Sequence, residues 1–598
     1  MKEISGRQLY YAFAAGGQAV IAQREDLNKM NVYPVPDGDT GSNLSFTLKN
    51  IIEQTQISQS AGETMQSLAE SALSGARGNS GILFAQFVNG MAENIGDATH
   101  LSIEKFSSAV SHAAKTAYGA ISNPVEGTML TVMKDFGDSL KEKHLTAKDF
   151  VSLLKVGMRV VKKSLASTKD KLEALKKANV IDAGAKGFAA FLEGFMEFIE
   201  QGAHVDHLQD DARPEIRFSA KAEHHDEIDV DEDLTFRYCT EGYVAGENID
   251  LENIRSRLGS YGDSLIVAGS KKMARVHIHT DHPDKIFQTL RDFGEIREQK
   301  ADDMHRQYQM VHARKFEIAL VIDSTCDLPD TVLDEHQIYE VPLMVNFGDM
   351  QFLDGLTLKT QKFYKLLSSE KAHPTTSQPN IKTFSKLYDH LTSHYTSVIS
   401  ISMSSGLSGT YNSAKQAADS IDGAKISVVD SRETASGLGL LALNAARDIG
   451  KGLSHEEVVR NIHSNRDRTH SFVSARSLKY FVRGGRVSPL KGFIGKLINL
   501  KPIIGVDDEG KAFFRQKAYS YRQSDEKILA MIQELHETKG IQNFAIVHGQ
   551  DEEHAKAMAE EITRRTGVSP EYVDDITPVL GAHAGPGAMD IAVITRKS

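Results

Sequence analysis

The sequence contains little cysteine and little proline. Of its 598 residues, 2 are cysteines, Cys239 and Cys326, and there are 14 prolines against 46 glycines. Two cysteines exclude a disulfide framework and favour the reduced thiols of a cytoplasm. With 40% hydrophobic and 25% charged residues, the composition is typical of a soluble globular protein. It excludes disordered, collagen-like and fibrous chains.

An excess of positive charge and long apolar runs are also missing. The formal net charge is -11, so the chain lacks the basic surface that nucleic acids require, and we expect no nucleic-acid partner. No apolar run reaches the length of about 18 residues that a membrane helix needs, and residues 10–22 lack the features of a secretion signal. We therefore expect a cytoplasmic protein that is not an integral membrane protein.

The length predicts roughly three to five domains. Residues 1–203 form the first predicted domain, an all-helical one, because apolar residues recur there at helical spacing. The helical segments are expected at residues 5–21, 64–74, 82–94, 103–118, 150–165 and 185–199. Residues 204–234 are acidic and aperiodic, which predicts a linker that lets this domain move relative to the next one.

The remaining sequence predicts two further domains. Residues 235–314 contain three alternating strand patterns with helical segments between them, which indicates a small α+β middle domain. Residues 315–598 contain continuous apolar runs, among them FEIALVID, TSVISISM, AKISVVD and NFAIVHG, each followed by a helical segment. Apolar runs separated by helices predict an α/β domain with a parallel sheet.

The clearest short motif is NVYPVPDGDTGSN at residues 31–43. Asp37 and Asp39 stand two residues apart, so both carboxylates can converge on one cation. Hard oxygen ligands suit Mg²⁺, which bridges nucleotide phosphates. An Asp-Gly turn with solvated carboxylates is the alternative that these residues alone leave open.

Three more glycine-rich elements occur in the helical domain, at residues 74–81, 123–131 and 179–188. Each precedes a helix, where unsatisfied N–H groups favour phosphate, although each taken singly is an ordinary helix cap. Neither the Walker pattern nor a Rossmann fingerprint is present, which excludes the common nucleotide folds.

Together, the four elements resemble the nucleotide-binding subunit of dihydroxyacetone kinase (the DhaL family) over about residues 1–200. The resemblance implies an eight-helix barrel whose loops hold Mg-ATP at one end, with Asp37 and Asp39 as magnesium ligands and catalytic residues. One departure is Asn31, which stands where the sugar kinases have a third aspartate. The resemblance places the following residues around the nucleotide: Thr40, Gly41, Asn43, Gly78, Asn79, Ser80, Thr128, Met129, Asp182 and Gly184.

The middle domain contains a candidate metal site. In ARVHIHTD, His277 and His279 are two residues apart on a predicted strand, so both imidazoles project from one face. Cys239 on a second strand adds a third donor for a tetrahedral zinc site, whose fourth ligand the sequence leaves open, whereas surface polarity is the alternative. The segments YCTEGY, GDSLIVAG and VHIHTDHP resemble the middle domain of bacterial fatty acid kinase, and this resemblance implies zinc on Cys239, His277 and His279.

Hydroxyl-rich loops follow the apolar runs of the C-terminal region, at the strand ends where α/β folds bind ligands. Six segments in order, VIDSTCDLP, PTTSQP, SISMSSGLSGTYNSA, RGGRVS, KPII and GAHAGPG, resemble the DegV family of fatty-acid-binding proteins. The resemblance implies a two-part α/β fold with the acyl chain in an apolar tunnel. It places the carboxyl group at the tunnel mouth, beside hydroxyl loops that contain Ser324, Thr376, Ser377, Ser404 and Ser405, and leaves open which residue of each pair makes the contact. Arg486 and His583 match basic positions at the same mouth.

The combined resemblances predict a fatty acid kinase fused to its lipid carrier. The expected reaction is ATP-dependent phosphorylation of a long-chain fatty acid, with Arg486 stabilising the acyl phosphate product. A homodimer and an acyl phosphate acceptor enzyme at the membrane surface are the expected protein partners. Two alternatives stay open, a small-molecule kinase with a lipid-sensing domain and a non-catalytic lipid-binding regulator.

Overall fold

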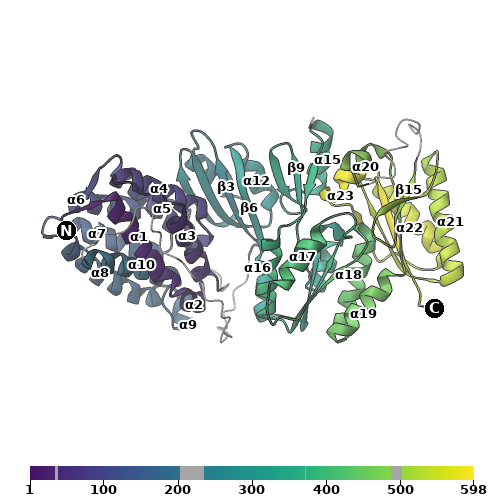
Figure 1. Cartoon of the computed structure of the whole chain (residues 1–598), viewed down its shortest axis with the longest axis horizontal. Coiled ribbons are helices and arrows are strands. Elements are labelled where there is room, and N and C mark those ends of the chain that lie inside the picture. Colours follow the sequence, from purple (N-terminus) through teal and green to yellow (C-terminus); the bar gives the residue numbers. More distant parts are fainter. Residues whose placement is uncertain (34–37, 202–234, 371, 487–500, 598) are drawn as a thin grey trace. The chain divides into compact units, whose positions relative to one another are not determined.

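The computed structural model describes residues 1–33, 38–201, 235–370, 372–486 and 501–597 (Figure 1). Asp37 and the predicted linker at residues 204–234 lie outside the described residues. The chain divides into two compact units, Met1–Gln307 and Tyr308–Ser598. Among the described residues, no helix is both long enough and apolar enough to cross a membrane.

The N-terminal part of the first unit is helical, as predicted. In its described part, each long helix packs against the next, and the last packs back against the first. The long helices are α1 (Gly6–Ile21), α3 (Thr40–Gln54), α4 (Ala61–Gly75), α5 (Gly78–Ile95), α6 (Ile103–Gly119), α7 (Met129–Lys143), α8 (Phe150–Lys171) and α10 (Ala183–Glu200). Short elements are α2 (Arg24–Lys29), α9 (Glu173–Ala178) and the paired strands β1 (Glu3–Ser5) and β2 (His100–Ser102).

Local sequence signals explain where these helices begin. Ser5 caps α1, and its hydroxyl and the Gln8 side chain form a reciprocal capping box.

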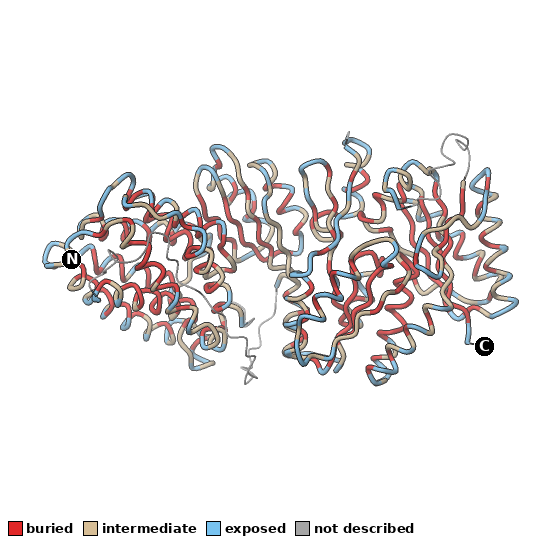
Figure 2. Tube along the Cα trace, viewed as in Figure 1, coloured by how far each residue is buried: buried red, intermediate tan, exposed pale blue. Residues whose placement is uncertain are grey.

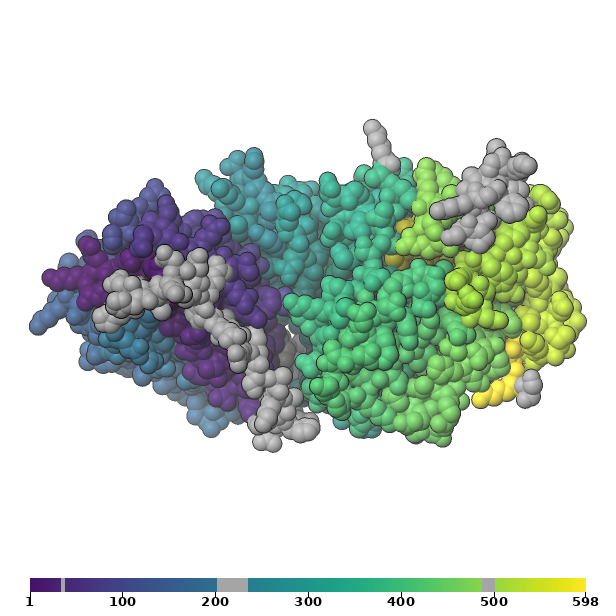
Figure 3. Space-filling model, in the orientation of Figure 1, coloured from purple at the N-terminus to yellow at the C-terminus, as the bar shows by residue number. Residues whose placement is uncertain are grey.

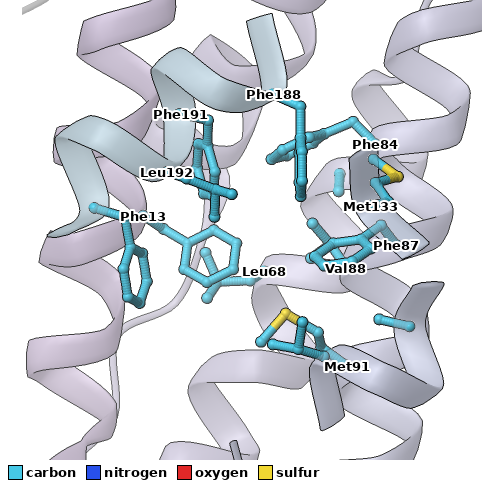
Figure 4. Close-up of a cluster of buried hydrophobic side chains, with 14 of the residues drawn as sticks. Phe13, Leu68, Phe84, Phe87, Val88, Met91, Met133, Phe188, Phe191 and Leu192 are labelled. Atoms are coloured by element: carbon cyan, nitrogen blue, oxygen red, sulfur yellow. The ribbon is translucent and has the colours of Figure 1, made fainter. Parts of the chain in front are cut away.

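Inside the ring of helices, aromatic side chains from different helices meet (Figure 4). Phe191 of α10 lies 4.8 Å from Phe84 and 5.3 Å from Phe13, measured between ring centroids. Such edge-to-face pairs add packing energy to a large buried apolar area.

The middle domain is a four-stranded antiparallel sheet with the order β4-β5-β3-β6. Alternate residues of its strands bury opposite faces: Leu265 and Val267 pack with the helices of this domain, whereas Ile266 and Ala268 join the core of the helical domain. Its elements are β3 (Tyr238–Ala245), α11 (Leu251–Leu258), β4 (Gly262–Ser270), β5 (Met273–Thr280), α12 (Pro283–Leu290) and β6 (Glu295–Asp303).

Buried hydrogen bonds join the helical and middle domains. The Arg275 guanidinium donates to the carbonyl of Ser74 at 2.8 Å, and the Asn89 amide donates to the carbonyl of Gly269 at 3.0 Å. The surfaces of the two domains meet along their boundary (Figure 3). Both domains therefore belong to one compact unit, and their relative motion stays a prediction.

The second unit has two main sheets. The first, β13-β12-β7-β8, is fully parallel, as predicted. The strands of a small antiparallel sheet, β10-β9-β11, come between β8 and β12 in the sequence. Their elements and the neighbouring helices are α13 (Met304–His312), β7 (Ile318–Asp323), α14 (Asp330–Glu335), β8 (Tyr339–Val341), β9 (Met344–Phe347), β10 (Met350–Leu353), α15 (Thr360–Ser369), β11 (Thr375–Ser377), α16 (Ile381–Thr392), β12 (Ser397–Ser402), α17 (Thr410–Asp419), β13 (Ile426–Asp430), α18 (Ala435–Gly450) and α19 (His455–Arg466).

The second sheet corrects the prediction of an all-parallel fold. Its order is β16-β15-β14-β19-β17-β18, and every pairing except β17 with β18 is antiparallel. An apolar run that is buried on both faces looks the same in either strand direction. The elements are β14 (Thr469–Ser474), α20 (Leu478–Gly484), β15 (Ile503–Val506), β16 (Ala512–Gln516), α21 (Tyr521–Lys539), β17 (Ile541–His548), α22 (Glu552–Thr566), β18 (Val573–Asp575), α23 (Pro578–Ala584) and β19 (Met589–Thr595).

Buried residues run along the inward sides of the helices and through the sheets in both units (Figure 2). The helix α18 packs against β17 and β19 of the second sheet. Its apolar residues Leu438 and Leu441 belong to the main core cluster of this unit. The two-part α/β architecture predicted for this region is therefore present.

Candidate functional site

The beginnings of three helices converge in the helical domain. A Cβ atom built on Gly184, in the first turn of α10, would lie 2.9 Å from the Ser80 hydroxyl of α5 and 3.0 Å from Cε of Met129, at the start of α7. The first amides of a helix have no partner within the helix and favour an anion. The structure thus brings together Ser80, Met129 and Gly184, which the sequence assigned to one nucleotide site.

The start of α5 also touches α3. Gly78 has φ of +58°, and a Cβ atom there would lie 2.2 Å from Nδ2 of Asn43, so only glycine fits. The side-chain oxygen of Asn79 is buried and makes no hydrogen bond to any described residue. A buried acceptor without a donor fits a ligand that brings one, such as a nucleotide hydroxyl or amino group.

Asp182 holds two of these helices in place. Its carboxylate accepts hydrogen bonds from the amide of Ala185, at 2.7 Å, and from the amide of Met129. Burial raises the pKa of Asp182 to about 6, against the effect of these two hydrogen bonds. Asp182 therefore fixes the starts of α10 and α7 relative to one another, and Thr128 stands at the N-cap position of α7.

Part of the candidate magnesium motif, residues 34–37, lies outside the described residues. Asp39 is half-buried at the N-cap position of α3, next to Thr40 and Gly41 in its first turn. Asn31 is buried, and its side-chain oxygen accepts a hydrogen bond from the Thr40 hydroxyl at 2.8 Å. Asn31 therefore orients Thr40.

Cys239, His277 and His279 form a cluster on one face of the middle-domain sheet. Their candidate ligand atoms all lie within 4.8 Å of one another, and Cys239 pairs with His279 across β3 and β5. His277 is 2% exposed and His279 is 7% exposed, which excludes the alternative of surface polarity. The Nε2 atom of His277 is buried without a hydrogen-bond partner in the described part of the chain. These donors fit zinc.

Charged side chains lie on the same face of the sheet, and one of them contacts the start of α5 in the helical domain. Glu241 pairs with His277 on β5 and with Lys300 on β6, and its Oε1 accepts a hydrogen bond from the Gly78 amide at 3.2 Å. Burial would raise the pKa of Glu241, but Lys300 and His277 outweigh it and hold the pKa well below the usual range. Burial and the charges of Glu241, Asp302 and Asp39 raise the pKa of the Cys239 thiol against the effect of Lys300.

Sequence reasoning missed Glu241, Lys300 and Asp302. Glu241 follows Cys239 by two residues on the same strand, so it had to share a face with Cys239, and this spacing could have found it. Lys300 and Asp302 lie on β6, which was not predicted as a strand because its sequence, EIREQKADD, is mostly charged.

In the second unit, Thr376 and His583 come together. The Thr376 hydroxyl and Nε2 of His583 are 2.9 Å apart, and Nδ1 of His583 is buried without a partner among the described residues. Burial, with help from Arg486 and His373, lowers the pKa of His583 to about 4, so its imidazole is neutral at pH 7. Arg486 itself is exposed.

The predicted serines have other contacts. Ser324 is 1% exposed, and its hydroxyl donates to Asp354 at 2.7 Å and accepts from the Leu343 amide at 3.0 Å. Ser404 is buried, and its hydroxyl donates to the carbonyl of Gly510 at 2.6 Å.

The remaining two predicted serines lie on the surface. Ser405 is exposed and bonds to the carboxylate of Asp430. Ser377 is exposed and accepts a hydrogen bond from Asn346 at 3.3 Å. Among the predicted acyl-site residues, the described contacts therefore bring Thr376 and His583 together, and Arg486 acts on His583 through its charge.

Three family models match successive parts of the chain. Residues 34–197 match the DAK2 domain, residues 235–311 match the FakA-like middle domain of fatty acid kinase, and residues 317–596 match the DegV family. Uncharacterized proteins of Staphylococcus epidermidis and Staphylococcus aureus are 32% and 31% identical to this chain over 317 residues, or 52% of its length. The chain spans 57% and 58% of the length of these relatives.

Solved structures match the second unit. DegV from Bacillus subtilis, described as a fatty acid binding protein, is 30% identical, and a DegV family protein from Thermus thermophilus is 29% identical. Each match covers 100% of that structure and 47% of this chain, with a TM-score of 0.44. From the family models, the chain is a fusion of a DAK2 domain, a FakA-like middle domain and a DegV-family domain.

Proposed function

We propose that this chain transfers the γ-phosphoryl group of ATP to a long-chain fatty acid held by its DegV-family domain, giving an acyl phosphate for phospholipid synthesis. The observation that carries the proposal is the presence of the DAK2 domain, the kinase-like middle domain and the DegV-family domain in one chain. A kinase that acts on a carried lipid requires both a nucleotide site and a lipid carrier, and this polypeptide would supply both.

The nucleotide would bind where α5, α7 and α10 begin. Amides at helix N-termini suit the phosphates, and the buried side-chain oxygen of Asn79 suits a donor of the nucleotide. Asp37 and Asp39 would hold Mg²⁺, which supplies charge neutralisation at the phosphates when it is bound. Cys239, His277 and His279 would hold zinc, which would order the sheet face that covers this site.

The reaction needs no strong general base. A fatty acid carboxyl group has a pKa of about 4 to 5, so it is ionised at neutral pH. A carboxylate oxygen forms a bond to the γ-phosphorus, the bond from phosphorus to the bridging oxygen breaks, and that electron pair leaves with ADP. Positioning and charge neutralisation therefore supply the catalysis.

The acyl carboxylate would bind at Thr376 and His583. The Thr376 hydroxyl and Nε2 of His583 bond to each other, so with a neutral imidazole the pair keeps one donor for the carboxylate. When the Nε2–H group donates to Thr376, that donor is the Thr376 hydroxyl, which binds the carboxylate without a strong ion pair. Arg486, whose charge acts on His583, would stabilise the additional negative charge of the acyl phosphate.

The test uses the purified full chain with Mg²⁺, ATP and oleate. We expect ATP consumption that depends on the fatty acid, and an acyl phosphate that hydroxylamine traps as the hydroxamate. Dihydroxyacetone in place of oleate is the control. ATP consumption with dihydroxyacetone alone would favour the small-molecule kinase, and no consumption with either acceptor would favour a lipid-binding regulator.

A further inference from the structure

We infer that Glu241 of the middle domain is a positioning residue for ATP, because it holds the phosphate-binding loop at the start of α5. The inference rests on the proposed function, since it assigns a role in binding the nucleotide. It extends that function to a domain in which the sequence predicted no nucleotide-binding residue. Three features carry this role: the hydrogen bond from the Gly78 amide to Glu241, the backbone conformation of Gly78, and the contacts that fix the Glu241 side chain.

The hydrogen bond crosses between two domains. Oε1 of Glu241 accepts from the Gly78 amide at 3.2 Å, and the two residues are 163 positions apart in the sequence. Glu241 is 3% exposed, so water does not compete for this bond. A carboxylate at the first amides of a helix is also stabilised by the helix dipole.

Gly78 cannot hold its own conformation. Its φ of +58° lies in the left-handed region, and it has no side chain through which neighbours could fix it. The preceding residue is held from α3, where the Thr47 hydroxyl accepts from the Arg77 amide at 3.3 Å and the Arg77 guanidinium lies 3.4 Å from the Phe46 ring centroid. Glu241 holds the other side of this turn.

Glu241 is itself fixed within the sheet. Lys300 Nζ lies 3.5 Å from its Oε1 and 2.6 Å from Asp302, and Nδ1 of His277 lies 3.9 Å from the same Oε1. Its two partners, Lys300 and His277, stand on the two strands that flank β3. A carboxylate held from both sides cannot follow Gly78 if the loop moves, so it sets the direction in which the next amides, those of Asn79 and Ser80, point.

The competing explanation is that Glu241 only joins the two domains. Other buried hydrogen bonds do this without touching the loop, and the bond from Asn89 to the carbonyl of Gly269 is one of them. Asn89→Ala therefore removes a contact between the same two domains, but at a position on α5 that is remote from Gly78. It is the matched control for a purely structural effect.

The experiment measures binding of a fluorescent ATP analogue with Mg²⁺ to the full chain. Glu241→Ala should weaken binding about 10-fold or more, the scale of one lost hydrogen bond to a charged group. Glu241→Gln should retain more affinity, because its amide oxygen still accepts from Gly78. Glu241→Asp should weaken binding although it keeps the charge, because its oxygen falls short of Gly78. Asn89→Ala should bind within about twofold of wild type.

Steady-state kinetics and metal analysis complete the test. The KM for ATP should rise in Glu241→Ala while the KM for the fatty acid stays unchanged, and the zinc content should match wild type. The inference would be overturned if folded Glu241→Ala and Glu241→Asp bound the ATP analogue with wild-type affinity. It would also be overturned if Asn89→Ala lost as much affinity as Glu241→Ala, or if the wild-type chain bound no nucleotide. If wild type binds the nucleotide and responds to Glu241 but forms no acyl phosphate, only the proposed function fails.

Discussion

The hydroxyl of Thr376 and Nε2 of His583 lie 2.9 Å apart, although 207 positions separate them in the sequence. Thr376 belongs to β11 and His583 to α23, and these elements pack against one another. This pair, with the charge of Arg486 acting on His583, is the point at which the proposed function would place the carboxylate of the fatty acid.

Thr376→Val should weaken fatty acid binding about 10-fold, because it removes one hydrogen bond to a charged group and keeps the shape of the side chain. Displacement of a fluorescent fatty acid from the full chain measures this loss. Ser369→Ala, a change on the exposed end of α15, is the control. Unchanged affinity in Thr376→Val would remove Thr376 from the acyl site.

Ser324→Ala should lower stability rather than lipid affinity. The Ser324 hydroxyl joins Asp354 to the Leu343 amide, and Asp354 in turn accepts from the Val579 amide at the start of α23. Leaving these buried groups without a partner costs about 1 to 3 kcal/mol. Urea denaturation measures this change, and a selective loss of lipid affinity in a fully folded variant would instead support a direct contact.

Asp39→Ala, and equally Asp37→Ala, should reduce acyl phosphate formation at least about 100-fold, because the metal contributes several kcal/mol of charge stabilisation. Hydroxamate trapping measures the product. Fatty acid binding should be unchanged, since the DegV-family domain is separate in sequence from the DAK2 domain. Near-normal product formation in both variants would refute the magnesium assignment.

Metal analysis of the purified chain should find about one zinc per molecule, because two histidines and a cysteine suit tetrahedral coordination. The double variant Cys239→Ala, His277→Ala should lose it, whereas Cys326→Ala should retain it, since Cys326 is buried in the other unit. Wild type free of zinc after growth in metal-replete medium would contradict the assignment.

The second unit should lose stability as the pH rises. Glu433 is 5% exposed, and burial raises its pKa to about 8 from the ordinary 4.5, against the hydrogen bond from Ser471. A carboxyl group with a higher pKa in the folded chain takes up a proton on folding. Its contribution to stability is complete below about pH 4.5 and is lost as the pH rises through about 8.

Melting temperatures between about pH 5 and pH 8 measure this effect, which reaches about 1.4 kcal/mol per pH unit for one group. Glu433→Gln resembles the protonated state and should flatten the pH dependence. Glu560→Gln, an exposed change on α22, should leave the dependence as in wild type. Equal slopes in wild type and Glu433→Gln would exclude Glu433 as the source.

The sequence predicted the features that local patterns encode. Apolar periodicity located six of the eight long helices, with α6 beginning at Ile103 as expected, but gave no range for α3 or α7. The glycine-rich motifs correctly preceded α5, α7 and α10. The i, i+2 spacing of His277 and His279 placed both imidazoles on one face, which the structure confirms through their shared cluster.

Features that depend on long-range contacts were beyond prediction. The strand β6 forms at the edge of the sheet through pairing with β3, although its charged residues have low strand propensity. The bond between Gly78 and Glu241 exists only because the middle domain packs on the helical domain. The strand directions in the second main sheet likewise depend on the tertiary fold, which an apolar run in the sequence does not indicate.

The position of β19 constrains the order in which the protein can fold during synthesis. This strand lies between β14 and β17 in the interior of its sheet, yet it follows both of them in the sequence. Until the ribosome has released residues 589–595, β14 and β17 each have an unpaired edge that can pair with another chain. The first unit is complete by Gln307 and needs no such wait. Nascent chains are therefore most exposed to aggregation late in synthesis, when the kinase-like half is already folded and the second sheet still lacks an interior strand.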